Sequence, residues 1–147
     1  MNQDDDTNDL KRFIGAQDPV YETVRAELAA GAKRTHWMWF VFPQLKQLGR
    51  SATAKRYGIE GMAEAAAFAQ HSVLGARLRE CTALVLAAQG KTAHEIFGSP
   101  DDMKLMSCMT LFEAASSDEP AFGEVLARYF SGRRDDVTLR LLGQAGS

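Results

Sequence analysis

Start and stop signals of α-helices recur along this 147-residue chain, and they constrain its fold more than any other feature. Asp18-Pro19, Ser99-Pro100 and Asp118-Glu119-Pro120 each place a capping side chain before a proline, which is typical of a helix start. Apolar side chains follow at spacings of three and four residues, and glycines close most segments. The pattern predicts an all-α, compact single-domain bundle of about eight short-to-medium helices.

Further caps refine this outline. Ser51 and Ser72 are expected to cap helices, and Thr92 with Glu95 fits a capping box before a stop at Gly98. We expect a disordered tail over residues 1–8, a single helical domain over 9–142 and a C-terminal tail over 143–147. One buried cluster is predicted to contain these residues: Trp39, Phe40, Leu78, Val85, Met109, Phe112 and Phe130.

Composition excludes several classes of protein. The net charge is −2 and the pI is about 5.9, which argues against a nucleic-acid binder. Cys81 and Cys108 stand alone in apolar helical patterns, so they predict buried free thiols with no zinc spacing and no disulfide framework. The start of the chain is polar and acidic, and the longest apolar run, residues 37–42, is too short to span a bilayer. We therefore expect a cytoplasmic protein with no membrane contact, metal or cofactor.

Residues 36–45 read HWMWFVFPQL and form the most unusual stretch. Both tryptophans lie in it, and each large ring hides roughly 150–250 Å² when buried. His36 and Gln44 then need polar partners. We expect a short helix or turn that Pro43 ends, serving either as packed core or as the wall of a pocket.

Three groups of residues offer chemistry, each with a structural alternative. His36 is a candidate general acid or base, although a hydrogen-bonded structural histidine is the favoured interpretation. Lys104 and Ser107 share a helix face one turn apart, as a Ser-Lys pair or by chance. Basic residues bracket the aromatic run as an anion-attracting frame or as ordinary solvated edges: Lys33, Arg34, Arg50, Lys55 and Arg56.

Several segments together resemble domain-of-unknown-function family 1810, small bacterial proteins often labelled calpastatin. They include HWMWFVFPQ at 36–44, LGRS at 48–51, HSVLG at 71–75, GSPDD at 98–102 and MTLF at 109–112. The resemblance covers roughly residues 9–142 and implies a mostly helical single domain without a known activity. The label does not fit, because calpastatin-type inhibitors are disordered and this chain has the pattern of a folded domain.

Three hypotheses for function follow. The first is a binding module for a small anionic or nucleotide-like ligand, in an aromatic-walled pocket. The second is an enzyme acting on such a ligand with His36 as acid or base. The third is a structural or protein-interaction domain whose aromatic run is core. The binding hypothesis predicts that the following residues converge on one cavity: His36, Trp37, Gln44, Tyr57, Lys104 and Ser107.

Overall fold

A computed structural model describes residues 9–146 of the protein. In chain order the helices are α2 (Lys11–Gln17), α3 (Tyr21–Ala29), α4 (Met38–Val41), η1 (Lys46–Leu48), α5 (Ala52–Arg56), α6 (Met62–Gln70), α7 (Leu74–Ala87), α8 (Ala93–Phe97), α9 (Asp101–Ala115), α10 (Ala121–Phe130) and α11 (Asp136–Gly146). No strand occurs in the described range, which confirms the all-α prediction. The expected tail over residues 1–8 lies outside that range, and α11 runs beyond residue 142 to Gly146.

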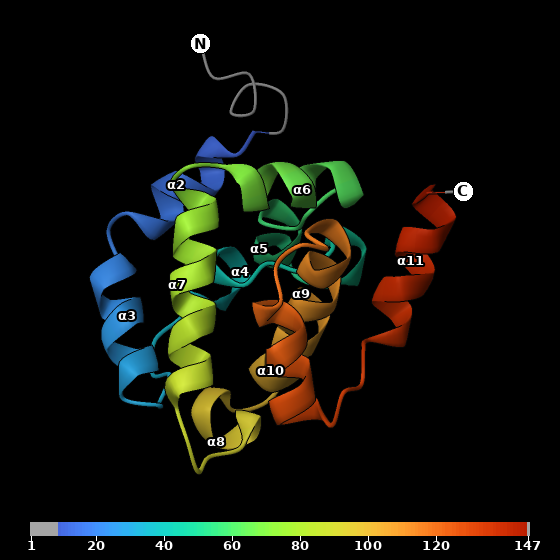
Figure 1. Ribbon diagram of the computed structural model, residues 1–147. Coiled ribbons are helices and arrows are strands. Elements are labelled where there is room, and N and C mark those ends of the chain that lie inside the picture. Colours follow the sequence, from blue (N-terminus) through green and yellow to red (C-terminus); the bar gives the residue numbers. More distant parts are fainter. Residues whose placement is uncertain (1–8, 147) are drawn as a thin grey trace.

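Two long helices organise the domain (Figure 1). α9 packs against α6, α8, α10 and α11, and α7 packs against α3, α6 and α10. The core lies between these helices and continues through ring contacts from Phe68 to Phe112 and on to Phe122, with centroid separations of 5.3 and 6.0 Å. The connection from α4 to α6 contains only the short helices η1 and α5, and together with the N-terminal half of α9 it lines the pocket described below.

Local signals at several helix ends are confirmed. The Ser51 hydroxyl accepts a hydrogen bond from the amide of Ala54, and Thr92 forms the predicted capping box with Glu95. Gly31 and Gly98 adopt φ values of +67° and +74° where α3 and α8 end. Such left-handed backbone favours glycine, which explains these stops.

Several expected helix caps are wrong. Neither Ser99 nor Asp118 supplies a cap, because α9 and α10 have Pro100 and Pro120 as N-caps with no side-chain hydrogen bond. Asp18 follows α2 as its C-cap, and its carboxylate pairs with Arg77 at 2.9 Å, so it caps no new helix. Ser72 is exposed, and His71 caps α7 instead, because its Nδ1 accepts hydrogen bonds from the amides of Val73 and Leu74. A buried imidazole therefore replaces the hydroxyl that the sequence suggested.

The predicted core is largely confirmed, with one exchange in the aromatic run. Five of its seven members are buried: Phe40, Leu78, Val85, Met109 and Phe112. Phe130 and Trp39 are only partly buried and pack on the edge of the core. The expectation that Trp39 would be buried and Trp37 would face a cavity is wrong, because Trp37 is the core residue, with 1% of its surface exposed.

Candidate functional site

Two adjoining hollows lie between the 44–58 segment and α9. The larger, called the Lys104 pocket, has a volume of about 450 Å³ and is lined by Gln44, Leu48, Gly49, Arg50, Ser51, Ala54, Pro100, Met103, Lys104, Ser107 and Asp135. The smaller, called the Trp39 slot, has a volume of about 10 Å³ and is lined by Met38, Trp39, Phe42, Gln44, Ala54, Tyr57 and Lys104. Gln44, Ala54 and Lys104 line both, so the slot adjoins the pocket.

The six candidate residues divide into two groups. Gln44, Lys104 and Ser107 line the Lys104 pocket, and Tyr57 lines the adjoining slot. Neither His36 nor Trp37 lines either hollow. His36 is exposed and lies beside Trp39, at a centroid distance of 6.5 Å. Trp39, which the sequence assigned to the core, supplies the aromatic wall expected of Trp37.

Lys104 comes from the first turns of α9, and acidic and aromatic neighbours surround its ammonium. Its Nζ is 3.9 Å from Oδ1 of Asp101 and 5.7 Å from the ring centroid of Trp39. The other oxygen of Asp101 is only 2.9 Å from Nζ of Lys33, whose side chain is 7% exposed. Asp101 is therefore bound more closely to Lys33 than to Lys104, and its attraction to Lys104 is the weaker of the two.

Unlike Lys104, two other polar side chains of the Lys104 pocket have no polar partner in the described part of the chain. The Gln44 amide forms no side-chain hydrogen bond there, although its backbone oxygen accepts from Ile59 at 2.9 Å. Arg50 is exposed and forms no ion pair with described residues. An amide offers both a donor and acceptor, and a guanidinium offers five donors, so both suit a polar ligand.

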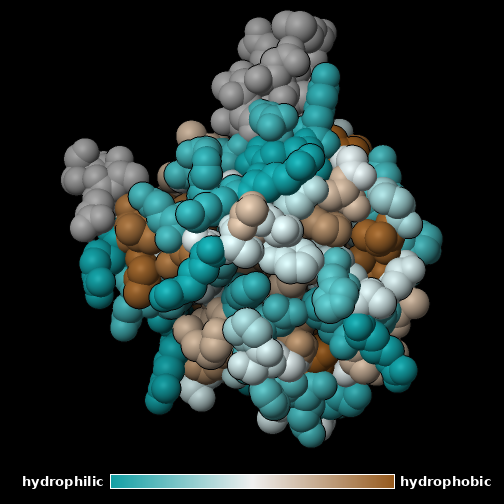
Figure 2. Space-filling view, turned by 180° about the vertical axis from the view of Figure 1, so that it is seen from behind, coloured by the Kyte–Doolittle hydropathy of each residue, from teal (hydrophilic) through white to brown (hydrophobic). Residues whose placement is uncertain are grey.

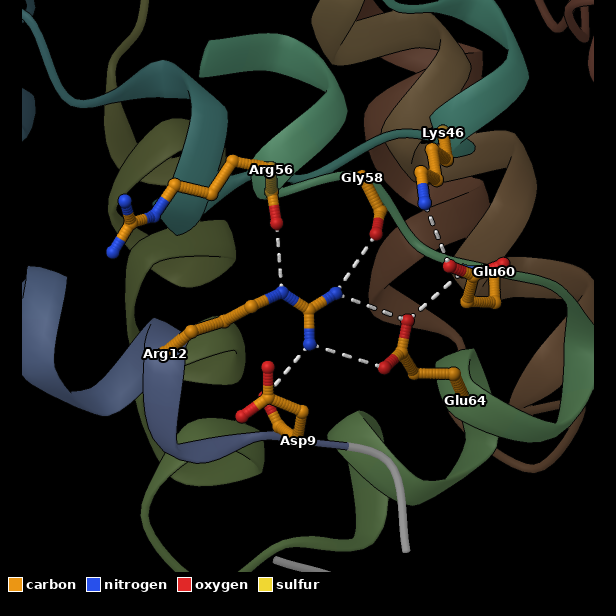
Figure 3. A network of polar contacts seen from close by, with 7 residues as sticks. All are labelled: Asp9, Arg12, Lys46, Arg56, Gly58, Glu60 and Glu64. Atoms are coloured by element: carbon orange, nitrogen blue, oxygen red, sulfur yellow. Dashed lines mark hydrogen bonds and ion pairs between the residues drawn. The ribbon is translucent and has the colours of Figure 1, made fainter. Parts of the chain in front are cut away.

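Arg12 holds the end of the 44–58 segment in place (Figure 3). Its guanidinium contacts both oxygens of the buried Glu64 carboxylate, at 3.2 and 3.3 Å. It also donates to the carbonyl oxygens of Asp9, Arg56 and Gly58, at 2.7 to 2.9 Å. These bonds use all five donors of the guanidinium and tie α2 and α6 to the segment that joins α5 to α6. Arg12 therefore anchors the part of the segment that follows the pocket residue Ala54.

Gly58 permits this loop to lie close to η1. A Cβ atom at Gly58 would lie 2.3 Å from the Cα of Lys46. Real Cβ atoms essentially never lie so close to another heavy atom. The close approach allows a short parallel bridge between Leu45 and Ile59, in which the amide of Lys46 donates to the Ile59 carbonyl at 2.8 Å. The glycine thus places Gln44 at the pocket.

A residue that the sequence analysis missed, Glu27, holds the start of the aromatic run. Its Oε1 accepts hydrogen bonds from the amides of Arg34 and Thr35 and from Nε1 of Trp37, at 2.8 to 3.1 Å. Its Oε2 accepts from the Thr35 hydroxyl at 2.7 Å. Burial raises the pKa of Glu27, but these hydrogen bonds to the charged form outweigh it and lower the pKa from 4.5 to about 2. Glu27 is therefore a structural anion.

Chemistry based on nucleophiles finds little support. Ser107 donates to the Met103 carbonyl at 3.3 Å rather than to a base. Cys108 is fully buried, and burial raises the pKa of its thiol. His36 forms no hydrogen bond with a carboxylate of the described residues. The described residues contain no group of three or more His, Cys, Asp or Glu side chains that could hold a metal ion.

The surface carries scattered apolar side chains. Figure 2 shows a face on which hydrophobic residues form separate patches among hydrophilic ones. Large apolar side chains that remain exposed are Met62, Met103, Val137 and Leu139, and of these Met103 lines the Lys104 pocket. None of the helices described here has the length and apolar character needed to cross a membrane.

Comparisons with known proteins agree with the resemblance noted in the sequence. The family model described as "Protein of unknown function (DUF1810)" matches residues 7–142, and no curated protein matches the chain. The fold is similar to the crystal structure of the conserved hypothetical protein Rv1873 from Mycobacterium tuberculosis, with a TM-score of 0.92 and 55% sequence identity. The match covers 93% of this chain and 98% of that chain. The protein therefore belongs to the DUF1810 family of proteins of unknown function.

Proposed function

We propose that this protein binds a small anionic molecule in the Lys104 pocket. The observation that carries the proposal is the convergence of Gln44, Arg50, Lys104 and Ser107 from separate segments on one hollow of about 450 Å³. Sites for small molecules typically have volumes of about 300–1,000 Å³ and combine apolar walls with a few polar groups. Pro100, Met103 and Leu48 supply such walls here.

The local charge of the chain supports an anion. Residues 28–59 contain six basic residues and no acidic one: Lys33, Arg34, Lys46, Arg50, Lys55 and Arg56. The net charge of the whole chain is nevertheless −2, so the positive charge is concentrated at this segment. At the pocket itself, Arg50 and Lys104 face one carboxylate, Asp135, and this excess of positive charge attracts a ligand of the opposite sign.

Binding is favoured over catalysis by the position of His36. The enzymatic hypothesis needs this imidazole within hydrogen-bond reach of a bound ligand. His36 does not line the pocket, and no other described histidine does. A binding role needs only the groups that lie there.

The test is a titration of the 15N-labelled protein with inorganic phosphate and with acetate at constant ionic strength, followed by NMR. We expect saturable shifts of the amide signals of Gln44, Lys104 and Ser107. The Lys104→Ala variant should weaken binding at least tenfold, because it removes the cation shared by both hollows. Lys11→Ala is the matched control, since it removes an exposed charge on α2 outside both hollows and should leave binding unchanged.

Shifts that rise linearly without saturation would contradict the proposal. So would equal affinities of the Lys104→Ala and parent proteins. Either result would mean that the Lys104 pocket is an ordinary surface depression without a ligand, and it would favour the structural hypothesis.

A further inference from the structure

We infer that the ligand of the Lys104 pocket is an amphipathic monoanion, a carboxylate with a short apolar body, rather than a nucleotide. The inference rests on the proposed function and adds a ligand class to it. Three features of the pocket carry it: its charge, its apolar wall and the size of the adjoining slot.

The charge of the pocket fits one negative charge. Arg50 and Lys104 are opposed by the carboxylate of Asp135, so the formal charge of the lining is +1. Asp135 is fixed in place, because its Oδ2 accepts hydrogen bonds from the amide and hydroxyl of Thr138 at 3.1 and 2.5 Å. A polyphosphate would bring several negative charges toward that fixed carboxylate, whereas a single carboxylate is balanced by the lining.

An apolar wall lies beside the cations. Met103 is 52% exposed although it is large and apolar, and it is the residue next to Lys104. With Leu48, Ala54 and Pro100 it forms the apolar part of the pocket lining. A ligand that covers Met103 would remove this exposed surface from water, which is favourable in proportion to the area covered.

The Trp39 slot is too small for a nucleobase. Its volume of about 10 Å³ holds about one water molecule, so no aromatic ring fits between Trp39 and Tyr57. The Trp39 ring also has neighbours already, with the Lys104 ammonium 5.7 Å and the His36 ring 6.5 Å from its centroid. Stacking, which would be the main aromatic contribution to nucleotide binding, is therefore absent from this site.

The experiment measures dissociation constants of the whole protein for acetate, butyrate and hexanoate by calorimetry or NMR. Each added methylene that becomes buried should tighten binding about fourfold, until the pocket is filled. Hexylammonium, which has the same chain and the opposite charge, should not bind. AMP should bind no more tightly than inorganic phosphate.

Met103→Gln should flatten the dependence of the dissociation constant on chain length, because it removes the apolar wall that the chain would cover. Met62→Gln is its matched control, because Met62 is a similarly exposed methionine on α6 that does not line the pocket. Affinities independent of chain length, or AMP binding more than tenfold tighter than hexanoate, would overturn the inference. In that case saturable phosphate binding that depends on Lys104 would still uphold the proposed function, and loss of all anion binding would refute both.

Discussion

Replacing Glu27 by glutamine should lower the free energy of unfolding by about 3 kcal/mol at pH 7. The fall of the Glu27 pKa from 4.5 to about 2 sets this magnitude, since each pKa unit corresponds to about 1.4 kcal/mol. Glutamine keeps an oxygen that can accept from Trp37 Nε1 but lacks the negative charge that strengthens all four bonds. Glu27 is buried, with 9% of the surface of the residue exposed, so solvent screens it little.

The sign of the pH dependence follows from the same values. The folded-state pKa is depressed, so the stabilisation is complete well above pH 4.5 and is lost as the pH falls toward 2. At pH 3.5 the difference in the free energy of unfolding between the parent protein and Glu27→Gln should shrink to about 2 kcal/mol. Urea unfolding followed by circular dichroism at both pH values measures it.

Glu22→Gln is the matched control, because Glu22 lies on the same helix with its side chain 84% exposed. We expect little change from it at either pH. Two results would refute the reasoning about Glu27: a loss below about 0.5 kcal/mol at pH 7, or a loss of equal size at both pH values.

Three other substitutions test the packing, each by urea unfolding. Phe112→Ala should cost about 3–5 kcal/mol, and a loss under roughly 1 kcal/mol would place Phe112 outside the core. Gly58→Ala should be strongly destabilising, because its Cβ would lie 2.3 Å from the Cα of Lys46; near-parent stability would show that the loop yields easily. Arg12→Lys should cost about 1–3 kcal/mol through lost hydrogen bonds, and additivity with Glu64→Gln would contradict the described pairing.

Helix ends governed by neighbouring residues could be predicted from the sequence. The Thr92 capping box and the glycines at positive φ depend only on residues within one turn, so their signals are local. The start of α7 was predicted wrongly, because its cap does not depend on local sequence alone. His71 and Ser72 are adjacent in the chain. Which of the two side chains caps α7 depends on the direction in which the chain leaves the preceding helix, α6. Capping by an imidazole has no strong sequence signal.

The candidate site could be predicted in part for a similar reason. Lys104 and Ser107 share a face because helical spacing dictates it, and both line the pocket. Trp37 and Trp39 exchanged their expected places because α4 is a single turn preceded by irregular chain, which gives no periodicity from which to assign faces. Glu27 gave only an indirect signal, as the last acidic residue before the acid-free stretch 28–59.

The different places of the two tryptophans have an optical consequence. Trp37 is sealed in the core, with its indole N–H bonded to Glu27, whereas Trp39 is partly exposed at the slot. Because the chain has no other tryptophan, Trp39→Phe leaves a fluorophore whose emission reports on the core. Trp37→Phe leaves one whose emission and quenching respond to water and solutes near Lys104. A pair of single-tryptophan proteins can therefore follow unfolding and pocket occupancy as separate signals.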